Sequence, residues 1–163
     1  MYAILLIPIL GLFAGFQPVE ELSKQDQFIQ KHIDSAKEVE RVTCIPYYIV
    51  LAQSAYESGW GTSNLANDAN NLFGIKWYSN SPTDFHIVDG GKKRWRCYGS
   101  TDDSFRDYGK FIMQNTTIPN YNSNDYLRWC EWVRKICYSG CNNYRYEKNI
   151  RNIIENHILR PTP

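Results

Sequence analysis

The sequence lacks an excess of charge of either sign, and it lacks an apolar run long enough to cross a membrane. Its 18 Lys and Arg residues and 17 Asp and Glu residues leave a formal net charge of +1 at pH 7. Such a small charge provides no broad field to attract DNA or an acidic membrane, so we expect no nucleic-acid partner. The uncharged apolar run at residues 3–16 is shorter than the ~20 residues that span a bilayer, so we also expect no membrane span.

The spacings that hold metal ions are missing as well. The three histidines are scattered, and no Cys-x-x-Cys pair occurs among the five cysteines, so we predict no metal site. If Cys130 and Cys137 lie on one straight helix, they are roughly 10 Å apart, beyond the ~7 Å limit for a disulfide. Cys137 and Cys141 can instead meet across a helix end. The alternative is that all five thiols are small buried apolar groups.

Length and composition predict one packed domain, because a typical domain takes about 100–200 residues and this chain has 163. Its 5 Trp, 12 Tyr and 7 Phe residues exceed what a core of this size needs, so some rings are expected in a groove, where they can stack on ligands such as sugars. We place this domain at residues 23–163. Residues 1–22 form an apolar N-terminal segment, which is either a signal peptide or a segment that packs on the domain or on a partner.

Apolar spacing predicts a mainly helical body. Ser23 and Asp26 have the spacing of a helix cap, and a helix is expected after them over residues 24–41. A second helix begins after Pro46. It is apolar nearly all round, so it should be central, and Gly59 can end it in the left-handed conformation. Similar patterns predict a short helical turn to Ala69 and helices after Ser100, after Asp125 and from Tyr146.

A short β pattern interrupts these helices. Residues 85–88 and 94–98 are typical of strands, and Asp89-Gly90-Gly91 between them is a hairpin turn signal. Together with an extended stretch at residues 72–78, they predict a lobe of two or three strands. The predicted fold class is therefore α+β, with a mainly helical body and a small β-hairpin lobe.

Glu57 is the candidate catalytic residue, because it is a carboxyl group at the end of the apolar helix. The negative end of the helix dipole and the rings of Tyr56 and Trp60 favour its protonated form, so its pKa should be raised. A carboxylic acid that keeps its proton near neutral pH can protonate the leaving oxygen of a glycosidic bond. The alternative is a carboxylate that is solvated or paired with Lys or Arg.

The stretch around Glu57 carries a family resemblance. Residues 45–76 read IPYYIVLAQSAYESGWGTSNLANDANNLFGIK, and they resemble glycoside hydrolase family 73, the bacterial peptidoglycan N-acetylglucosaminidases related to the flagellar muramidase domain. A thinner likeness extends over about residues 28–159. The resemblance implies a lysozyme-like fold, a β-1,4-linked substrate glycan that contains N-acetylglucosamine, and Glu57 as the catalytic acid.

The sequence departs from the family pattern where a second catalytic group is expected. The family has a Glu in its β lobe, but this chain has none there, so Asp84 is our candidate to hold the attacking water. Asp89 stands behind it as the second candidate to hold this water and as a substrate-binding candidate, unless it is only the hairpin turn residue. Near the C-terminus the chain keeps the family tyrosine as Tyr138. This phenol can hydrogen-bond the N-acetyl group or steady the developing cation, or else it packs against the last helix.

Four further residues are candidate substrate contacts. Phe73 and Trp77 can floor a sugar groove, and Trp60 adds a ring near Glu57. Asn71 can hydrogen-bond the acetamido groups of the sugars. Core packing is the alternative for Phe73, and a tight turn is the alternative for Asn71.

The sequence as a whole predicts an endo-β-N-acetylglucosaminidase that hydrolyses the glycan strands of bacterial peptidoglycan. We expect a monomer without a cofactor, with Glu57 as general acid assisted by Asp84 or Tyr138. It should act as a secreted enzyme in the periplasm or cell wall, or on a virion as an endolysin. The alternatives are a lysozyme (muramidase) or lytic transglycosylase and, from another class, a non-catalytic glycan-binding or structural module.

Overall fold

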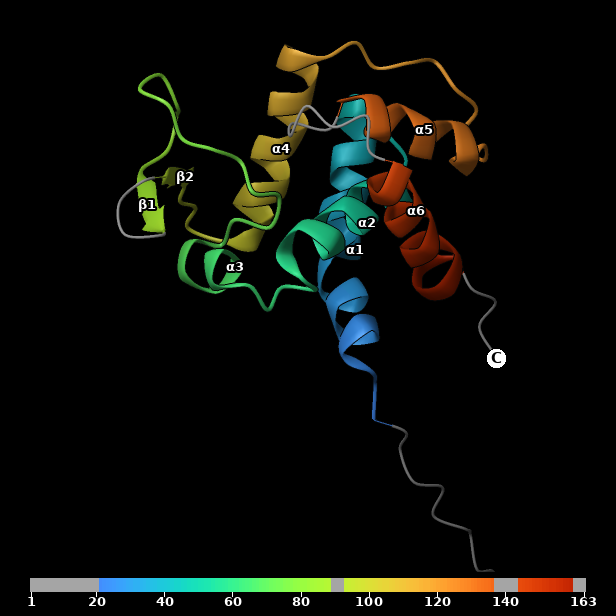
Figure 1. The fold of residues 1–163 in the computed structure, drawn as a ribbon, viewed down its shortest axis with the longest axis horizontal. Helices are drawn as coiled ribbons and strands as arrows, with labels where there is room; N and C mark the ends of the chain where they lie inside the picture. Colours follow the sequence, from blue (N-terminus) through green and yellow to red (C-terminus); the bar gives the residue numbers. More distant parts are fainter. Residues whose placement is uncertain (1–20, 89–92, 137–143, 160–163) are drawn as a thin grey trace, which may run out of the picture.

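The computed structural model describes residues 21–88, 93–136 and 144–159. Within these ranges the helices gather into one body, and a hairpin stands beside it next to α3 (Figure 1). The predicted α+β class, with a helical body and a small β-hairpin lobe, is confirmed. The elements are α1 (Lys24–Thr43), α2 (Tyr47–Ser58), α3 (Asn64–Ala69), β1 (Phe85–Val88), β2 (Lys93–Arg96), α4 (Thr101–Asn115), α5 (Tyr126–Ile136), α6 (Tyr144–Ile153) and the π-helical turn η1 (Ile154–Ile158).

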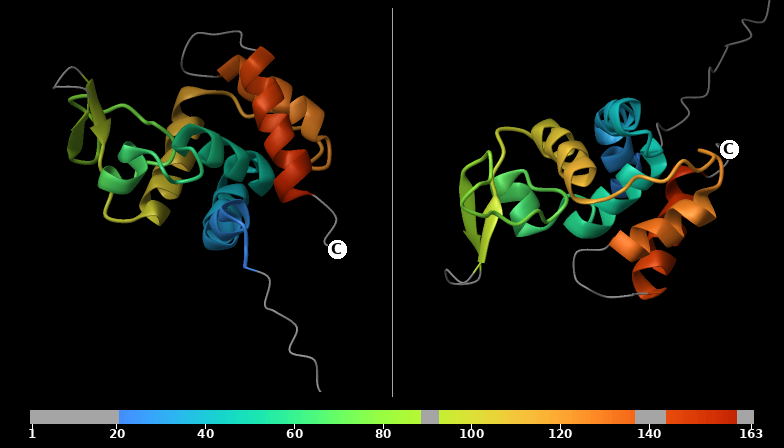
Figure 2. Two further views of the ribbon diagram at one scale, coloured as in Figure 1. Left: turned by 60° about the horizontal axis from the view of Figure 1, so that its bottom comes forward. Right: turned by 90° about the horizontal axis from the view of Figure 1, so that it is seen from above.

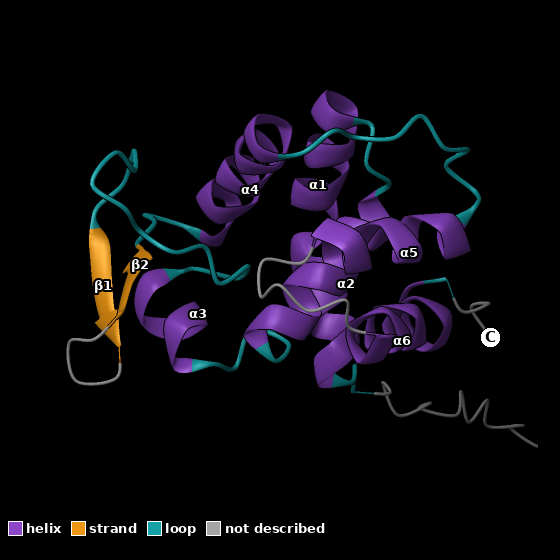
Figure 3. Ribbon diagram, turned by 45° about the horizontal axis from the view of Figure 1, so that its top comes forward, coloured by secondary structure: helices purple, strands orange, loops and turns teal. Residues whose placement is uncertain are grey.

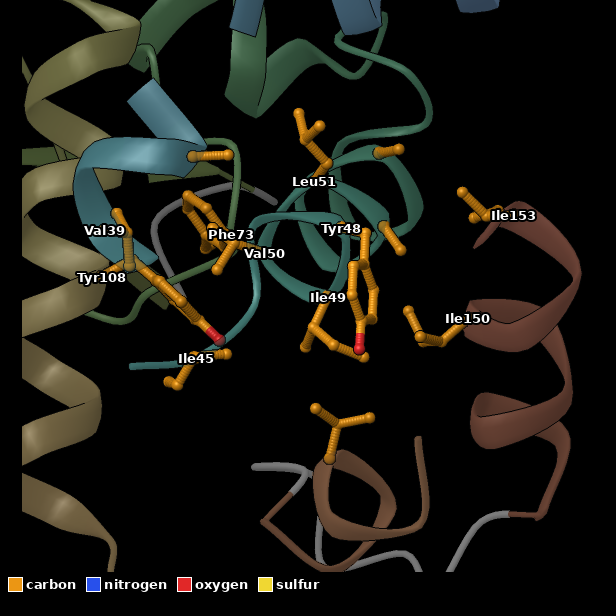
Figure 4. Packing of buried hydrophobic residues seen from close by; sticks show 14 of the residues in the cluster. Val39, Ile45, Tyr48, Ile49, Val50, Leu51, Phe73, Tyr108, Ile150 and Ile153 are labelled. Carbon is orange, nitrogen blue, oxygen red and sulfur yellow. The ribbon is translucent and has the colours of Figure 1, made fainter. Parts of the chain in front are cut away.

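The second helix, α2, is the centre of the body, as its apolar sequence predicts. Ile49, Val50 and Leu51 are fully buried, and α2 packs against α1, α5, α6 and η1. Figure 4 shows these side chains among residues of the neighbouring helices. Gly59 ends α2 with a φ of 58°, and its N–H bonds back to carbonyls of the last turn. The predicted left-handed end is therefore confirmed, and it fixes where the chain leaves the helix.

Serine caps set the beginnings of three other helices. Ser23, Ser63 and Ser100 accept hydrogen bonds from the backbone N–H three residues further on, at the starts of α1, α3 and α4. The first helix extends two residues beyond its expected end at residue 41, to Thr43. No helix in the described ranges is long and apolar enough to cross a membrane.

The cysteine predictions are tested only in part. Cys44, Cys97 and Cys130 form no disulfide among the described residues. The pair Cys137 and Cys141 lies outside them.

The β lobe has two strands, the lower of the two numbers that the sequence predicts. β1 and β2 pair antiparallel in continuous register, and Lys76 adds one isolated bridge to Trp95. The stretch at residues 72–78 does not form a third strand, because Gly74 takes a φ of 61°, which turns the chain out of the extended conformation. β2 ends at Arg96 instead of residue 98. The lobe is thus a two-stranded hairpin (Figure 3), and residues 75–77 of the preceding loop are hydrogen-bonded to β2.

Candidate active site

Glu57 lies in the last turn of α2. From the end of this helix the chain runs to α3, which lies beside the hairpin of the β lobe (Figure 2). Its Oε2 atom is 4.0 Å from the point where a β-carbon on Gly74 would stand, and a ring carbon of Trp95 is 3.8 Å from the same point. The carboxyl group also shares a hydrogen bond with the phenol of Tyr146 from α6. Residues from α2, α6 and the loop before the lobe therefore meet at one carboxyl group.

Burial raises the pKa of Glu57, and a smaller opposing effect comes from a hydrogen bond with Tyr146. Although Glu57 is an exposed residue, protein atoms on two sides keep part of the water from its carboxyl group. Among the described residues, no Lys or Arg contributes to its titration. The predicted direction is confirmed, and the alternative of an ion-paired carboxylate finds no support in the described part of the chain.

Tyr146 is the main site residue that the sequence did not reveal. It lies in the first turn of α6 and is only 5% exposed, and its helical spacing with Ile150 and Ile153 suggested nothing beyond core packing. The phenol oxygen accepts a hydrogen bond from Gln53 Nε2 at 3.3 Å, and the hydroxyl bonds Glu57. Gln53 precedes Glu57 by four residues on α2, a spacing that places the two on one helix face and was a signal available in the sequence.

Trp60 does not shield Glu57 as expected. Its ring packs edge-on against Phe28 of α1 and His157 of η1, with centroid distances of 5.7 and 5.1 Å. The physical reason is the backbone, because residues 59–61 all have positive φ angles between 58° and 75° and reverse the chain direction. The ring beside the site is instead Tyr146, against which Tyr56 packs edge-on at 5.1 Å.

Asn71 and Phe73 also differ from the expectation that they contact substrate. Asn71 is 1% exposed, and its amide bonds the carbonyls of Ile75 and Arg96 and the N–H of Ile75. Phe73 is 6% exposed and stacks on Tyr108 at 4.1 Å (Figure 4). Both side chains are thus used to hold the loop before the lobe, which matches the structural alternatives weighed for them.

Trp77 lies on the hairpin face that points away from Trp95. The Arg94 guanidinium stands over the Trp77 ring at 5.5 Å and over Phe85 at 4.7 Å. Because neighbouring residues of a strand point to opposite faces, Arg94 and its two rings are on the face opposite Trp95. Trp95, which was not among the predicted site residues, is the hairpin ring that lies beside Gly74, the glycine next to Glu57.

The second catalytic group stays a prediction. Asp84 is exposed, just before β1, and its carbonyl accepts a hydrogen bond from the Cys97 N–H at 2.9 Å. It lines a surface hollow together with Cys97, Gly99 and Asp103. This is the lobe position from which a base was expected. Asp89 and Tyr138 lie outside the described residues, so their proposed roles also stay predictions.

One protein-family model matches residues 33–159, and its description is Mannosyl-glycoprotein endo-beta-N-acetylglucosaminidase. Over 115 residues the chain is 29% identical to a peptidoglycan hydrolase FlgJ of Vibrio cholerae, covering 61% of this chain and 34% of that protein. Over 107 residues it is 32% identical to the exo-glucosaminidase LytG of Bacillus subtilis, covering 60% and 38%. The chain thus spans about a third of the length of these two relatives.

Solved structures share the fold. A peptidoglycan hydrolase from Sphingomonas sp. A1 superposes with a TM-score of 0.66 at 22% identity, covering 80% of this chain and 87% of that one. The catalytic domain of the autolysin Auto from Listeria monocytogenes gives 0.63 at 22% identity, covering 82% and 84%. These likenesses confirm the predicted lysozyme-like form of the α+β fold.

Proposed function

The chain belongs to the Mannosyl-glycoprotein endo-beta-N-acetylglucosaminidase family, and from this membership we propose that it hydrolyses β-1,4 glycosidic bonds of bacterial peptidoglycan at N-acetylglucosamine. The observation that carries the proposal is the partly desolvated carboxyl group of Glu57. Burial raises its pKa, and no described Lys or Arg lowers it. Such a group keeps its proton to a higher pH than an ordinary Glu, as a general acid for glycoside cleavage requires.

In the proposed reaction, Glu57 donates its proton to the glycosidic oxygen while the bond from that oxygen to the anomeric carbon breaks. A water oxygen forms the new bond to the same carbon and loses one proton to a base. Asp84 is the candidate base, and Tyr138 the candidate group that steadies the cationic sugar. If the mechanism is inverting, the two carboxyl groups are separated by about 6.5–9.5 Å to admit the water. One water is consumed for each bond cleaved.

The mode and place of action belong to the same proposal. We favour internal cleavage of the glycan strand, and an enzyme of this kind acts where its substrate lies, outside the cytoplasm. The names of the relatives, a peptidoglycan hydrolase and an exo-glucosaminidase, support the substrate class. Secretion into the periplasm or cell wall and delivery on a virion as an endolysin are the two routes that would place a monomer there.

The decisive experiment compares wild type with Glu57→Gln on purified sacculi, by reducing-end release and mass analysis. We expect new reducing N-acetylglucosamine ends and a loss of roughly 100- to 10,000-fold in the variant. Glu38→Gln is the matched control, because Glu38 is an exposed residue of α1 that pairs with Arg41. Reducing N-acetylmuramic acid would indicate a lysozyme, and its anhydro form a lytic transglycosylase. Binding without release from wild type would indicate a glycan-binding module.

A further inference from the structure

We propose that Tyr146 is a positioning residue, which fixes the Glu57 carboxyl group for proton transfer as the last donor of a one-way hydrogen-bond relay from the core. The relay runs from Tyr108 of α4 to Gln53 of α2, then to Tyr146 of α6 and finally to Glu57 of α2. This inference rests on the proposed function of Glu57 as general acid. It adds to that function three side chains that the acid needs in order to stay in place.

The direction of the relay follows from its bonds. The Tyr108 hydroxyl donates to Gln53 Oε1 at 2.6 Å, so the other end of the amide, its NH2 group, faces Tyr146. Gln53 Nε2 donates to the Tyr146 oxygen at 3.3 Å. A phenol oxygen that accepts one bond still has its own proton to donate, and Tyr146 donates it to Glu57. All three bonds therefore point toward the carboxyl group.

Burial keeps water from replacing the hydrogen bonds between these side chains. Tyr108, Gln53 and Tyr146 are 2%, 6% and 5% exposed. A buried amide or phenol that loses its partner pays the full cost of desolvation, so each member has few alternatives to the bonds it makes. Ring packing adds a second restraint, because Phe73 stacks on Tyr108 (Figure 4) and Tyr56 packs edge-on against Tyr146. Glu57 is exposed, but the group that holds it is not.

The relay suits an acid that must give up its proton. A hydrogen bond donated by Tyr146 is stronger to a carboxylate than to a carboxylic acid, so it strengthens as the proton leaves Glu57. Gln53 supports this effect, because its donation to the phenol oxygen lowers the pKa of Tyr146 against the upward effect of burial and makes the phenol a better donor. The bond also limits rotation of the carboxyl group and so fixes the direction in which the proton is offered.

The titratable groups that face this relay among the described residues are Tyr56 and Glu57 from α2, Tyr108 from α4 and Tyr146 from α6. Burial raises the pKa of Tyr146 well above its ordinary value, so the phenol remains a donor throughout the working range of a glycosidase. Changes in the titration of Glu57 that follow a change in the relay are therefore assigned to the bond from Tyr146.

The first test is a ¹³C NMR titration of Glu57, with its signal assigned by its loss in Glu57→Gln. Tyr146→Phe removes a bond that favours the charged form, so the pKa of Glu57 should rise. Tyr108→Phe should raise it in the same direction, because an unpaired Gln53 oxygen turns to accept the Tyr146 proton. Tyr48→Phe is the matched control, since it removes another buried phenol hydroxyl, one that donates to the Ser123 carbonyl, and it should change nothing.

The second test is kinetic. In Tyr146→Phe we expect kcat to fall roughly tenfold or more, with KM changed less than about twofold and the alkaline limb of the activity profile moved to higher pH. A purely structural role would lower activity through loss of folded protein without moving that limb, which circular dichroism and a melting curve would show. An unchanged pH profile together with an unchanged Glu57 titration would overturn the relay.

The two proposals can fail separately. If wild type releases no reducing ends but Tyr146→Phe still shifts the Glu57 titration, the proposed function fails and the relay stands. If wild type is active but neither Tyr146→Phe nor Tyr108→Phe shifts it, the relay fails and the proposed function stands. Should Tyr146→Phe not fold, Tyr108→Phe decides the matter alone, because the Tyr108 hydroxyl bonds Gln53 and in a relay acts on Glu57 through it, so an unchanged titration there contradicts a relay.

Discussion

Two carboxylates in the described part of the chain each accept a hydrogen bond from a buried tyrosine, and among the described residues only one of them has a cationic partner. Asp107 of α4 binds the Tyr98 hydroxyl and the Arg96 guanidinium of β2, both at 2.7 Å. Glu57 binds the Tyr146 hydroxyl and has no described Lys or Arg acting on its titration. The Asp107 cluster is a closed structural joint between lobe and body. The Glu57 cluster stays open on one side and costs energy to ionise, which is what proton donation needs.

The largest effect should come from breaking the closed joint. Asp107→Asn leaves the Arg96 guanidinium, which is 9% exposed, without its counter-charge. Removal of one partner of a buried ion pair costs about 3–5 kcal/mol. Urea unfolding monitored by circular dichroism measures this cost. If the free energy of unfolding falls by less than the ~0.5 kcal/mol of an ordinary surface substitution, the ion pair does not join the lobe to the body.

A smaller loss is expected from the phenol of the same joint. Tyr98→Phe removes a hydrogen bond to a carboxylate from a residue that is 6% exposed. Bonds to charged groups are worth about 1.5–3 kcal/mol, and the remaining ion pair should limit the loss to the lower end. The free energy of unfolding is the measurement. A loss equal to that of Asp107→Asn would mean that phenol and guanidinium act as one unit.

Gly74 offers a way to sharpen the comparison, because it lies beside the Glu57 carboxyl group. Gly74→Ala places an L side chain at a φ of 61° and a methyl group 4.0 Å from Glu57 Oε2. The conformational cost is about 1–2 kcal/mol in unfolding. The methyl group also takes space beside the acid, so KM for sacculi should rise. Gly61→Ala is the control, since Gly61 also has a positive φ, of 75°, and its added methyl group would meet the Phe28 ring.

The smallest effect is a pH dependence of stability with a definite sign. The folded pKa of Glu57 is raised, so its ionisation disfavours the folded state, and stability is lost as pH rises through that value. Glu57→Gln cannot ionise, so it should be more stable than wild type at neutral pH and no different well below the ordinary glutamate pKa of ~4.3. Melting temperatures across this range test the sign. A variant that is less stable at neutral pH would show that the carboxylate is stabilised where it stands.

The local parts of the fold were predictable because their causes are local. Ser23 and Ser100 cap helices with their side-chain hydroxyls, and Gly59 ends α2 through its backbone N–H. The direction of the raised pKa of Glu57 follows from its place on a buried helix. The prediction that the Trp60 ring shields Glu57 was wrong, because a tryptophan after a helix gives no sign in the sequence that its own φ is positive. That angle, and not the residue type, decides which side of the chain the ring takes.

The contacts of the site were not predictable in the same way, because they join segments far apart in the chain. Tyr146 and Glu57 are brought together by the packing of α6 on α2, which apolar spacing predicts only as burial. Asn71 has the polarity of a sugar-binding residue. Its recorded hydrogen bonds, however, all go to backbone groups of Ile75 and Arg96. Only coordinates separate these two uses of one amide.

The C-terminal helical segment touches the end of α2 twice, since Tyr146 of α6 bonds Glu57 and His157 of η1 packs on Trp60. During synthesis the ribosome delivers these two residues last among the elements described. A nascent chain that has emerged only through α5 already contains Glu57, yet neither the phenol that holds it nor the imidazole that buttresses the following turn. The contacts around Glu57 and the following turn are therefore complete only when α6 and η1 are present.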